Sequence, residues 1–233
     1  MQRHYVIGDV HGKYEMLLAL VEKLPSHARL IFVGDLVNRG KRSREVIDFV
    51  RNYAYRVVKG NHEGYMQVQG AQFLLMLENY KDELSIPYQY VGGSPILQSY
   101  KLLTKDQERP HLYNLNQEGL LQLKKDLAWI ESLPYVVELG RMPNYHLPIV
   151  ISHGNLGDYW HLKDKNPRDF EFYAIGNRST PSKESPIFNI YGHISVESVA
   201  IGENFVCVDT GCGKHPEAKL SAYCIETKEV VDV

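Results

Sequence analysis

Residues 5–12 read YVIGDVHG, and this stretch sets the pattern that decides the fold. A short apolar run ends in Gly-Asp, and polar residues follow at once. The same arrangement returns at residues 30–40 (LIFVGDLVNRG) and, with asparagine in place of aspartate, at residues 55–63 (YRVVKGNHE). Apolar runs of this length, each closed by a glycine turn, predict three strands with similar endings.

The segments between these strands are amphipathic. Apolar residues recur at helical spacing over residues 15–24 and again over residues 43–51. Strands that alternate with helices at this pitch form βαβ units around a parallel sheet. Asp9 and Asp35 are 26 residues apart, and so are Asp35 and Asn61. Because neighbouring parallel strands end at the same edge of a sheet, we expect these side chains to meet there.

The rest of the chain divides into a helical and a strand-rich part. Helical patterns cover residues 64–80 and 118–133, with a turn at 91–95 between them. Residues 155–186 are polar and contain three prolines, which predicts a long irregular loop. We expect the strands after Pro134 to form a second sheet, and residues 1–233 to form one domain. Those strands are predicted at 135–139, 149–152, 188–191, 205–209, 220–225 and 230–233.

Composition and charge limit the classes of function. The chain has 233 residues, 44% hydrophobic and 23% charged, which excludes a disordered or fibrous protein. A formal net charge of −2 argues against a protein that neutralises many phosphates, so we expect no nucleic-acid partner. Three cysteines without a CxxC motif indicate free thiols in a reducing compartment. Without a leader or a long apolar stretch, we expect a cytoplasmic protein with no membrane contact.

Side chains that bind metals follow five of the predicted strands. Carboxylate, imidazole and amide groups are ligands for Mn, Fe or Zn, and no thiolate is among them. One GDxHG or GNHE motif alone is often only a polar turn, but five strand ends with metal ligands need another explanation. Two metals about 3.5–4 Å apart would bind an oxyanion and activate water for displacement. The six residues are Asp9, His11, Asp35, Asn61, His153 and His193.

Taken together, GDVHG, GDLVNRG, GNHE, SHG and YGH resemble the motifs of the calcineurin-like metallophosphoesterases. Within that superfamily they are similar to the phosphoprotein phosphatase branch, and to its small bacterial and phage lambda-type serine/threonine phosphatases. The resemblance covers residues 4–212. It implies a four-layer α/β sandwich, in which two mixed β-sheets are flanked by helices.

The resemblance also implies a role for each matched ligand. It assigns Asp9 and His11 to a first metal and makes Asp35 the bridge to a second. Two divalent ions, Mn²⁺ by analogy with the small bacterial members, are implied, and Fe or Zn would fit the same ligands. A hydroxide that bridges them would attack phosphorus directly, without a phosphoenzyme. The implied ligands of the second metal are Asn61, His153 and His193.

Three further residues match the family's substrate-handling positions. His62 would protonate the leaving-group oxygen. Arg39 would bind the substrate phosphate, for which a planar guanidinium is suited. Arg178 would be a second phosphate-binding arginine, although this match rests on the short motif Gly-Asn-Arg at 176–178 and a solvated loop arginine is the alternative.

Asn38 departs from the family pattern. The pattern is GDxxDRG, and its second aspartate hydrogen-bonds the general-acid histidine. A neutral amide orients the ring without favouring the imidazolium. Two interpretations follow: a slowed or inactivated phosphatase with weakened acid catalysis, or a substrate whose leaving group needs little protonation, such as a nucleotide or polyphosphate.

The first expectation for function is a serine/threonine protein phosphatase that acts on a phosphorylated protein or peptide. The alternative is a symmetrical dinucleoside tetraphosphate hydrolase, a sister family that also lacks the aspartate. GNHE in place of GNHD, and a shorter chain, argue against that alternative. A phosphate-binding pseudophosphatase is disfavoured by the complete ligand set, and a nuclease by the near-neutral charge.

Overall fold

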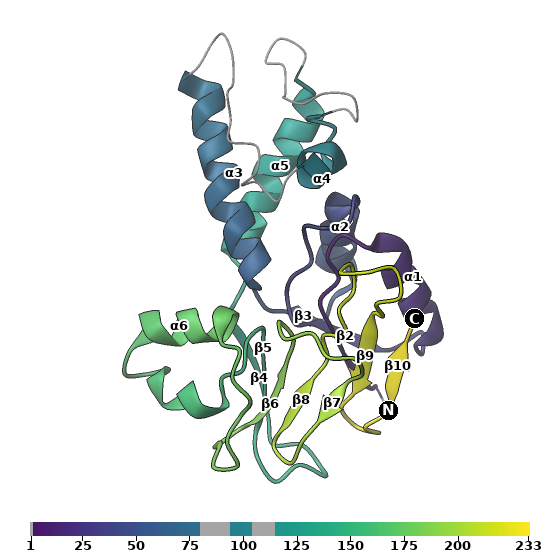
Figure 1. Cartoon of the computed structure of the whole chain (residues 1–233), viewed down its shortest axis with the longest axis vertical. Helices are drawn as coiled ribbons and strands as arrows, with labels where there is room; N and C mark the ends of the chain where they lie inside the picture. The colour runs from purple at the N-terminus through teal and green to yellow at the C-terminus, as the bar shows by residue number, and fades with distance from the viewer. Residues whose placement is uncertain (1, 80–93, 104–114) are drawn as a thin grey trace.

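The computed structural model describes residues 2–79, 94–103 and 115–233, and two mixed sheets form its centre (Figure 1). The first sheet has the order β10-β9-β1-β2-β3, and β1, β2 and β3 are parallel to one another. Its strands are β1 (His4–Ile7), β2 (Arg29–Phe32), β3 (Arg56–Val57), β9 (Ser221–Cys224) and β10 (Val230–Asp232).

The second sheet has the order β4-β5-β6-β8-β7. Its three central strands β5, β6 and β8 are parallel, and the two edge strands β4 and β7 pair antiparallel. The strands are β4 (Val136–Gly140), β5 (Ile149–Ser152), β6 (Phe188–Tyr191), β7 (Ala200–Ile201) and β8 (Phe205–Cys207). Two mixed sheets were expected, and the structure confirms them.

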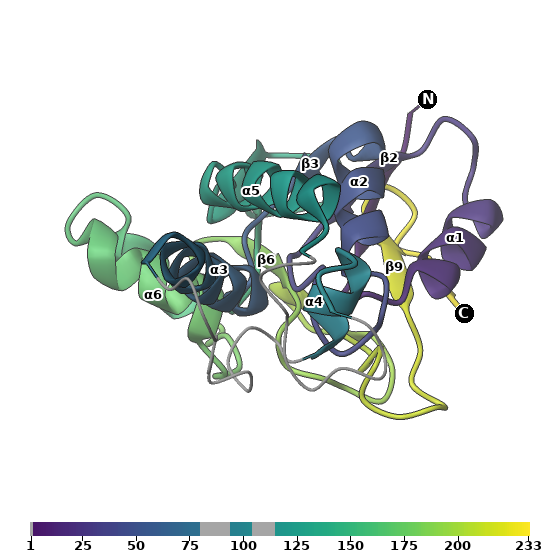
Figure 2. The same ribbon diagram turned by 90° about the horizontal axis from the view of Figure 1, so that it is seen from above.

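Helices cover the outer faces of both sheets and complete four layers. α1 (Tyr14–Lys23) and α2 (Ser43–Tyr53) lie on the first sheet, and α6 (Pro167–Gly176) lies with the 3₁₀ helix η2 (Gly157–Leu162) on the second. α3 (Asn61–Asn79), α4 (Ser94–Ser99) and α5 (Gln117–Glu131) extend beyond the sheets. Seen from above, α4 lies beside α2 and α3 beside α5 (Figure 2).

Side chains of the inner strands alternate between two apolar layers. In β2, Leu30 and Phe32 pack in the cluster under the helices, whereas Ile31 packs in the cluster between the sheets. β1 alternates in the same way, with Ile7 toward the helices and Val6 between the sheets. Because both faces are buried, these strands read as continuous apolar runs.

The expectation that all strands after Pro134 belong to the second sheet was wrong. β9 pairs antiparallel with β1, with Tyr223 opposite Val6, and β10 pairs with β9. These two C-terminal strands cover an edge of β1 that would otherwise present unpaired backbone groups to solvent.

The expectation of an irregular loop over residues 155–186 was also wrong, because η2 and α6 lie within it. The Asn166 side chain accepts the backbone N–H of Asp169 and caps α6, and Pro167 occupies the first turn. Phe170 and Ala174 then bury one face of the helix against the second sheet. Asparagine followed by proline is a helix-start signal that the polar composition obscured.

α3 begins at Asn61, three residues before the predicted start at Gly64. The GNHE motif therefore ends inside the first turn of a helix, and this turn holds His62 and Glu63 rigidly. The predicted end of this helix at Tyr80 and the turn at residues 91–93 lie outside the described residues. In the part of the chain that the structure describes, no helix has the length and apolar character to cross a membrane.

Candidate metal centre

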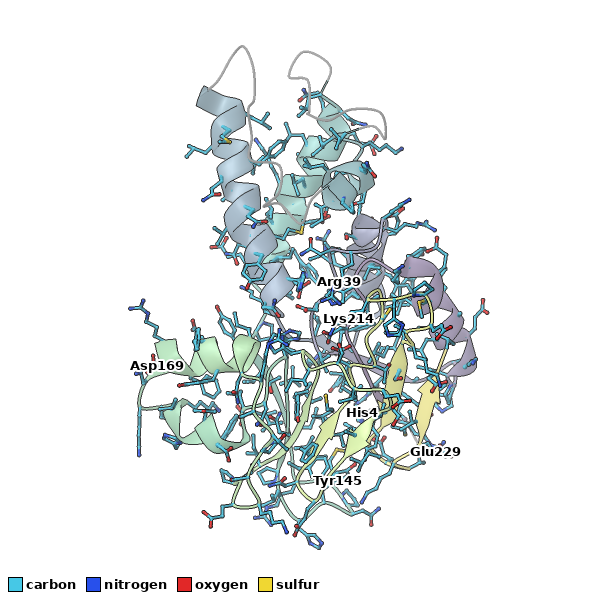
Figure 3. All side chains as sticks on the ribbon, in the orientation of Figure 1. His4, Arg39, Tyr145, Asp169, Lys214 and Glu229 are labelled. Atoms are coloured by element: carbon cyan, nitrogen blue, oxygen red, sulfur yellow. The ribbon has the colours of Figure 1, made fainter. Side chains whose placement is uncertain are left out.

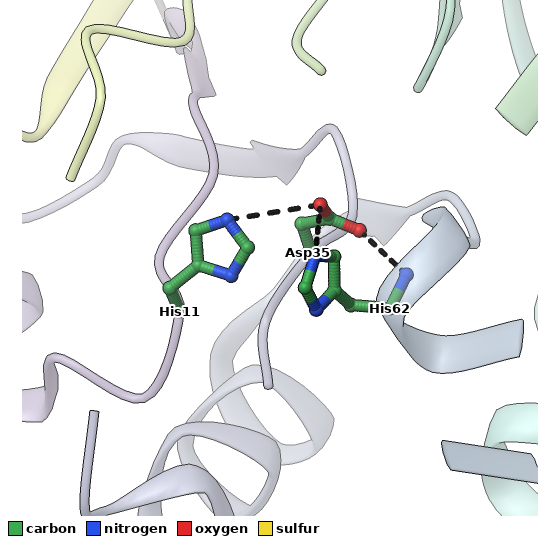
Figure 4. Close-up of side chains that lie close together, drawn as sticks. All are labelled: His11, Asp35 and His62. Carbon is green, nitrogen blue, oxygen red and sulfur yellow. Dashed lines mark hydrogen bonds and ion pairs between the residues drawn. The ribbon is translucent and has the colours of Figure 1, made fainter. Parts of the chain in front are cut away.

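The predicted ligands converge around Asp35, at the edge where the strands of both sheets end. Its Oδ2 lies 3.7 Å from His11 Nε2 and 3.8 Å from His62 Nε2 (Figure 4). Its Oδ1 lies 3.3 Å from His153 Nε2, which is in turn 2.9 Å from Asn61 Oδ1. Among the described residues, Asp35 is thus the one carboxylate that reaches histidines from α3 and from the turns after β1 and β5.

The two outer members of the set complete the cluster. Asp9 Oδ2 is 3.9 Å from His11 Nε2, and the rings of His153 and His193 stand 4.8 Å apart between centroids. Two groups of three side chains share Asp35, and within each group the possible ligand atoms lie within 4.8 Å of one another. They are His11, Asp35 and His62, and Asp35, His153 and His193. The structure therefore brings together all six residues that the sequence placed at strand ends.

The histidines are oriented so that one ring nitrogen faces the cluster. His11 Nδ1 donates to the Val37 carbonyl at 3.0 Å, and His153 Nδ1 donates to the Val33 carbonyl at 2.9 Å. A backbone acceptor at Nδ1 fixes the orientation of the ring and, in the neutral ring, leaves the lone pair on Nε2. Both Nε2 atoms point toward the carboxylates, as metal ligands would.

His193 gives the most direct test of whether the residues fit a metal. Its ring hydrogen-bonds the Gly176 backbone, and its Nε2 is buried without a partner among the described residues. A buried polar atom without a partner is costly, and a cation would satisfy it. The donor set of oxygen and imidazole nitrogen atoms fits a divalent ion such as Mn²⁺, Fe²⁺ or Zn²⁺.

The pKa shifts of the two buried carboxylates, Asp9 and Asp35, also favour a bound cation. Burial raises the pKa of Asp9 well above its usual range, and the charges of Asp209 and Asp35 add to this effect. Burial acts on Asp35 too, but the neighbouring histidines, above all His153, hold its pKa below the usual range. Crowded carboxylates of this kind are stabilised by bound cations.

The pKa values of the buried imidazoles are shifted in two opposite directions. Burial opposes the charge on His153, yet the Asp35 and Asp9 carboxylates raise its pKa to about 10. Burial lowers the pKa of His11 to about 4, and burial together with His153 does the same for His193. His11 and His193 are therefore neutral near pH 7, the form that ligates metals.

Backbone strain is concentrated at the site. Five non-glycine residues here have positive φ angles, between 49° and 73°, in a region that side chains with a Cβ seldom adopt. They are His11, Asp35, Asn38, Arg39 and His193. The strand-end turns thus hold strained conformations in order to direct these side chains inward.

Two glycines allow the backbone to approach the carboxylates. A Cβ on Gly60 would lie 2.3 Å from Asp35 Oδ1, and a Cβ on Gly192 would lie 2.2 Å from Asp9 Oδ1. Neither distance is possible for a real side chain. The glycines before Asn61 and His193 are therefore required by the packing of the cluster and not only by the turns.

Glu63 supports the site through the backbone. Its Oε2 accepts the N–H groups of Asp35 at 2.7 Å and Gly60 at 2.9 Å. Its Oε1 accepts those of Leu36 at 2.8 Å and Val37 at 3.3 Å. One fully buried carboxylate thereby fixes the turn that carries Asp35 against the start of α3.

Asn38 contacts the predicted general acid. Its Nδ2 lies 2.7 Å from His62 Nδ1, so the amide donates and His62 Nε2 is directed to the Asp35 side of the cluster. Asn38 Oδ1 is buried and has no partner in the described part of the chain. The Asn38 side chain therefore occupies the place of the second aspartate of the GDxxDRG pattern. It presents an N–H donor to His62 where a carboxylate would present an acceptor.

The two predicted phosphate-binding arginines stand at the rim. Arg39 and Arg178 are exposed, and neither pairs with a carboxylate among the residues described. Arg178 Nη1 donates to the His193 carbonyl at 3.3 Å, which places it beside the cluster. Burial lowers the pKa of His62 and the charges of both arginines act in the same direction, so both charges reach the site.

Sequence reasoning missed Asp209 as part of the site. This buried residue follows β8. Its carboxylate accepts hydrogen bonds from the Ser195 hydroxyl at 2.5 Å and from the backbone N–H of Gly211 at 2.8 Å. Its charge acts on Asp9. Asp209 also ends an apolar strand, so the pattern that marked the other residues was available to identify it.

The family model for calcineurin-like phosphoesterases matches residues 3–209 of the chain. The chain belongs to this family. The asymmetrical bis(5'-nucleosyl)-tetraphosphatase PrpE of Bacillus subtilis (strain 168) is 26% identical over 234 residues, which cover 89% of this chain and 85% of that protein. Serine/threonine-protein phosphatase 2 of Escherichia coli (strain K12) is 23% identical, over 96% of this chain and 94% of that protein.

A solved structure confirms the fold of this calcineurin-like phosphoesterase. The structure of a metallophosphoesterase from Sphaerobacter thermophilus matches with a TM-score of 0.55 and 16% identity, over 99% of this chain and 87% of that chain. The membership and the fold make the protein a phosphoester hydrolase with a four-layer sandwich.

Proposed function

We propose that the protein hydrolyses its substrate at a centre of two divalent ions. Asp9 and His11 would hold one ion, and Asp35 would bridge to the other. Asn61, His153 and His193 would hold the second. The observation that carries this proposal is the convergence of the other five side chains around Asp35, with the partnerless Nε2 of His193 among them. Bound there, the ions would supply positive charge that polarises a phosphoryl group and an attacking water.

Arg39 and Arg178 are suited to bind the phosphoryl oxygens. Both guanidinium groups are exposed at the rim and lack a carboxylate partner among the described residues. An unpaired guanidinium pairs with a phosphate through two parallel hydrogen bonds. A phosphoryl group held between them would face His62, which would protonate the leaving oxygen through Nε2.

The choice of substrate depends on the contact between Asn38 and His62. The amide donates to Nδ1 and supplies no negative charge beside the ring. General-acid help is worth about 10²–10⁴-fold, and an alkoxide leaving group needs most of it. A phosphate leaving group needs little of it. We therefore favour a phosphoanhydride substrate, a dinucleoside tetraphosphate or related nucleotide, and the Bacillus subtilis relative supports this choice.

A serine/threonine phosphoprotein is the second candidate. The Escherichia coli relative, named a serine/threonine-protein phosphatase, favours it, and so does the exposure of the two rim arginines to a large substrate. In that case the protein would hydrolyse alkyl phosphates with the weakened acid that Asn38 implies.

Initial rates with the manganese-loaded protein distinguish the two candidates. Diadenosine tetraphosphate and a phosphoserine peptide are assayed in parallel, with an aryl phosphate as a general substrate. We expect the dinucleotide to have the higher kcat/KM. A far higher value for the peptide would establish the protein phosphatase instead. Absence of turnover with all three substrates in Mn²⁺, Fe²⁺ and Zn²⁺ would overturn the hydrolytic proposal itself.

A further inference from the structure

Tyr65 lies one turn along α3 from His62, the predicted general acid. Their rings meet edge to face, with 6.0 Å between centroids and 75° between planes. Side chains three residues apart share one face of a helix, and each leans toward the helix N-terminus, so Tyr65 leans toward His62. His62 Nε2 in turn lies 3.8 Å from Asp35 Oδ2. The Tyr65 ring is therefore placed next to the candidate centre by its packing against a residue of the site.

The packing of α3 does not require this ring. The buried face of the helix is formed by residues such as Met66 and Phe73, which lie in the same apolar cluster as residues of α5. Tyr65 lies outside that face and is 57% exposed. Among the described residues its hydroxyl makes no hydrogen bond, and the ring of His62 is the only aromatic ring that it meets. The exposed part of the ring can therefore accept a ligand.

An exposed tyrosine alone indicates no function. Tyr53, at the end of α2, is 67% exposed and packs on Phe49, with 4.9 Å between ring centroids. Tyr65 differs from Tyr53 in its neighbour, which is a histidine of the candidate site. Val68 is 60% exposed and continues the apolar surface by one more turn. Tyr65 and Val68 thus form an exposed apolar strip on α3 that begins at His62.

The leaving group of the substrate begins beside this strip. To receive a proton, the leaving oxygen must lie about 3 Å from His62 Nε2. Asp35 is buried, and α3 extends from its side of the molecule beyond the two sheets (Figure 1). Arg39, whose charge acts on His62, lies near the base of the same helix (Figure 3). A group that extends from the centre toward solvent along α3 therefore meets Tyr65 first.

The contact between Asn38 and His62 limits the leaving group independently. Asn38 supplies no negative charge to the ring, so the leaving oxygen should need little protonation. A phosphate meets this condition, and so does a phenol, whose pKa is about 10, whereas the alkoxide of serine does not. Nucleotides and phenols share one further property, since both carry a flat aromatic ring. Such rings stack on an exposed tyrosine.

We infer that Tyr65 is a specificity-determining residue whose ring stacks on an aromatic ring carried by the leaving group. That ring is the base of a nucleotide or the ring of an aryl ester. The inference rests on the proposed hydrolytic function and names a feature of the group that leaves. Inorganic polyphosphate and alkyl phosphates carry no such ring, so Tyr65 would contribute nothing to their binding.

Two pairs of substrates isolate the effect of the ring. The anhydride pair is diadenosine tetraphosphate and inorganic tripolyphosphate, and the ester pair is 4-nitrophenyl phosphate and glycerol phosphate. In each pair only the first substrate carries an aromatic ring. The manganese-loaded protein and its variants Tyr65→Ala and Tyr65→Phe are assayed for kcat/KM with all four substrates. Tyr53→Ala, which removes a similarly exposed tyrosine from α2, is the matched control.

Alanine substitution at a base-stacking residue lowers affinity about 5–150-fold, so we expect the ratio within the anhydride pair to fall about tenfold in Tyr65→Ala. Tyr65→Phe retains the ring and should keep the ratio, as should Tyr53→Ala. Affinity for adenosine monophosphate, measured by calorimetry, should fall in Tyr65→Ala while that for orthophosphate changes less. A fall in the ester ratio alone would support the inference with an aryl ester as the source of the ring.

Two kinds of failure are distinguishable. Unchanged ratios in both pairs, with turnover intact, would overturn the inference and leave the hydrolytic proposal standing. An equal loss on all four substrates would also overturn it, because Tyr65 would then act by holding His62 in place. Absence of turnover of every substrate by the unaltered protein would instead refute the proposed function, and the calorimetric comparison would still decide whether Tyr65 binds an aromatic ring.

Discussion

Glu63 Oε2 accepts the backbone N–H of Asp35 at 2.7 Å, and this bond ties the centre of the site to the first turn of α3. The link is reciprocal, because the backbone N–H of His62 donates to Asp35 Oδ1 at 2.9 Å. The residue proposed to bridge two metals is therefore fixed through its main chain and its side chain by the same helix. Its position depends on groups that make no contact with a metal.

Replacement of Glu63 by glutamine tests this support. The amide of glutamine presents an NH₂ group to backbone N–H donors, so about two of the four hydrogen bonds are lost. Backbone donors left buried without a partner cost about 1–3 kcal/mol each, so we expect a free energy of unfolding about 2–6 kcal/mol lower. We also expect metal affinity to fall about 10–100-fold, as it does when supporting hydrogen bonds of ligands are removed.

Calorimetric metal titration and urea unfolding measure both effects. Glu22→Gln, which changes an exposed glutamate on α1, is the matched control and should match the unaltered protein. Unaltered metal affinity in Glu63→Gln would contradict the view that this carboxylate positions Asp35.

Gly60 and Gly64 form a natural pair for a second prediction, because they lie four residues apart at the start of α3. A Cβ at Gly60 would lie 2.3 Å from Asp35 Oδ1, whereas a Cβ at Gly64 meets nothing within 4 Å. We expect Gly60→Ala to lose metal-dependent turnover and to melt at lower temperature. Gly64→Ala should keep turnover and be more stable by about 0.5–1 kcal/mol, since alanine favours a helix. Equal behaviour of the two variants would show that the close approach at Gly60 is unimportant.

Asn38→Asp restores a carboxylate beside His62. A carboxylate can only accept, so it favours a proton on His62 Nδ1 and stabilises the charged ring that donates to an alkoxide. We expect kcat on a phosphoserine peptide to rise by about tenfold or more, and turnover of diadenosine tetraphosphate to change less. Steady-state rates on the two substrates provide the measurement. Unchanged or lower peptide turnover would refute the idea that Asn38 limits acid catalysis.

The three cysteines are buried free thiols, and their chemistry is predictable. Burial raises the pKa of Cys207 and of Cys212 to about 12. At pH 8 a thiol-specific reagent should label none of the three in the folded protein and all three in urea, because burial keeps the reagent away from the sulfur atoms. Rapid labelling of the folded protein would contradict the burial.

The same two thiols make stability depend on pH in the alkaline range. An unfolded thiol has a pKa of about 8.5, and the folded thiols have higher values, so the folded protein holds more protons above that pH. Their contribution is complete below about pH 8.5 and is lost as pH rises toward 12. Urea unfolding of Cys207→Ala from pH 8 to 10.5 should show a shallower decline than the unaltered protein.

The sequence predicted the first half of the fold because its signals were local. β1 and β2 are buried on both faces, and all three strands are followed by a glycine turn, so strand, turn and ligand could be recognised within about ten residues. The side chains then met as expected, because parallel strands end at the same edge. His11, Asp35 and His153 followed from this rule alone.

The features that the sequence did not predict depend on long-range pairing or were hidden by polar composition. No local feature of residues 220–225 indicates that they pair with β1 instead of β8, because an apolar strand fits either sheet. α6 was concealed by its polar surface, although Asn166 and Pro167 mark its start. Asp209 was overlooked although it follows the apolar strand β8, so its omission was not a limit of the strand pattern.

The central claim is that Asp35 holds two metals for hydrolysis, and a manganese titration tests it most directly. Bound metal per chain is measured by calorimetry, and turnover of an aryl phosphate is followed at each addition. We predict two ions per chain, turnover that rises with the second, and an Asp35→Asn variant that binds both more weakly. Turnover without added metal in the chelator-treated protein, or an Asp35→Asn variant that binds two ions as tightly as the unaltered chain, would contradict the account.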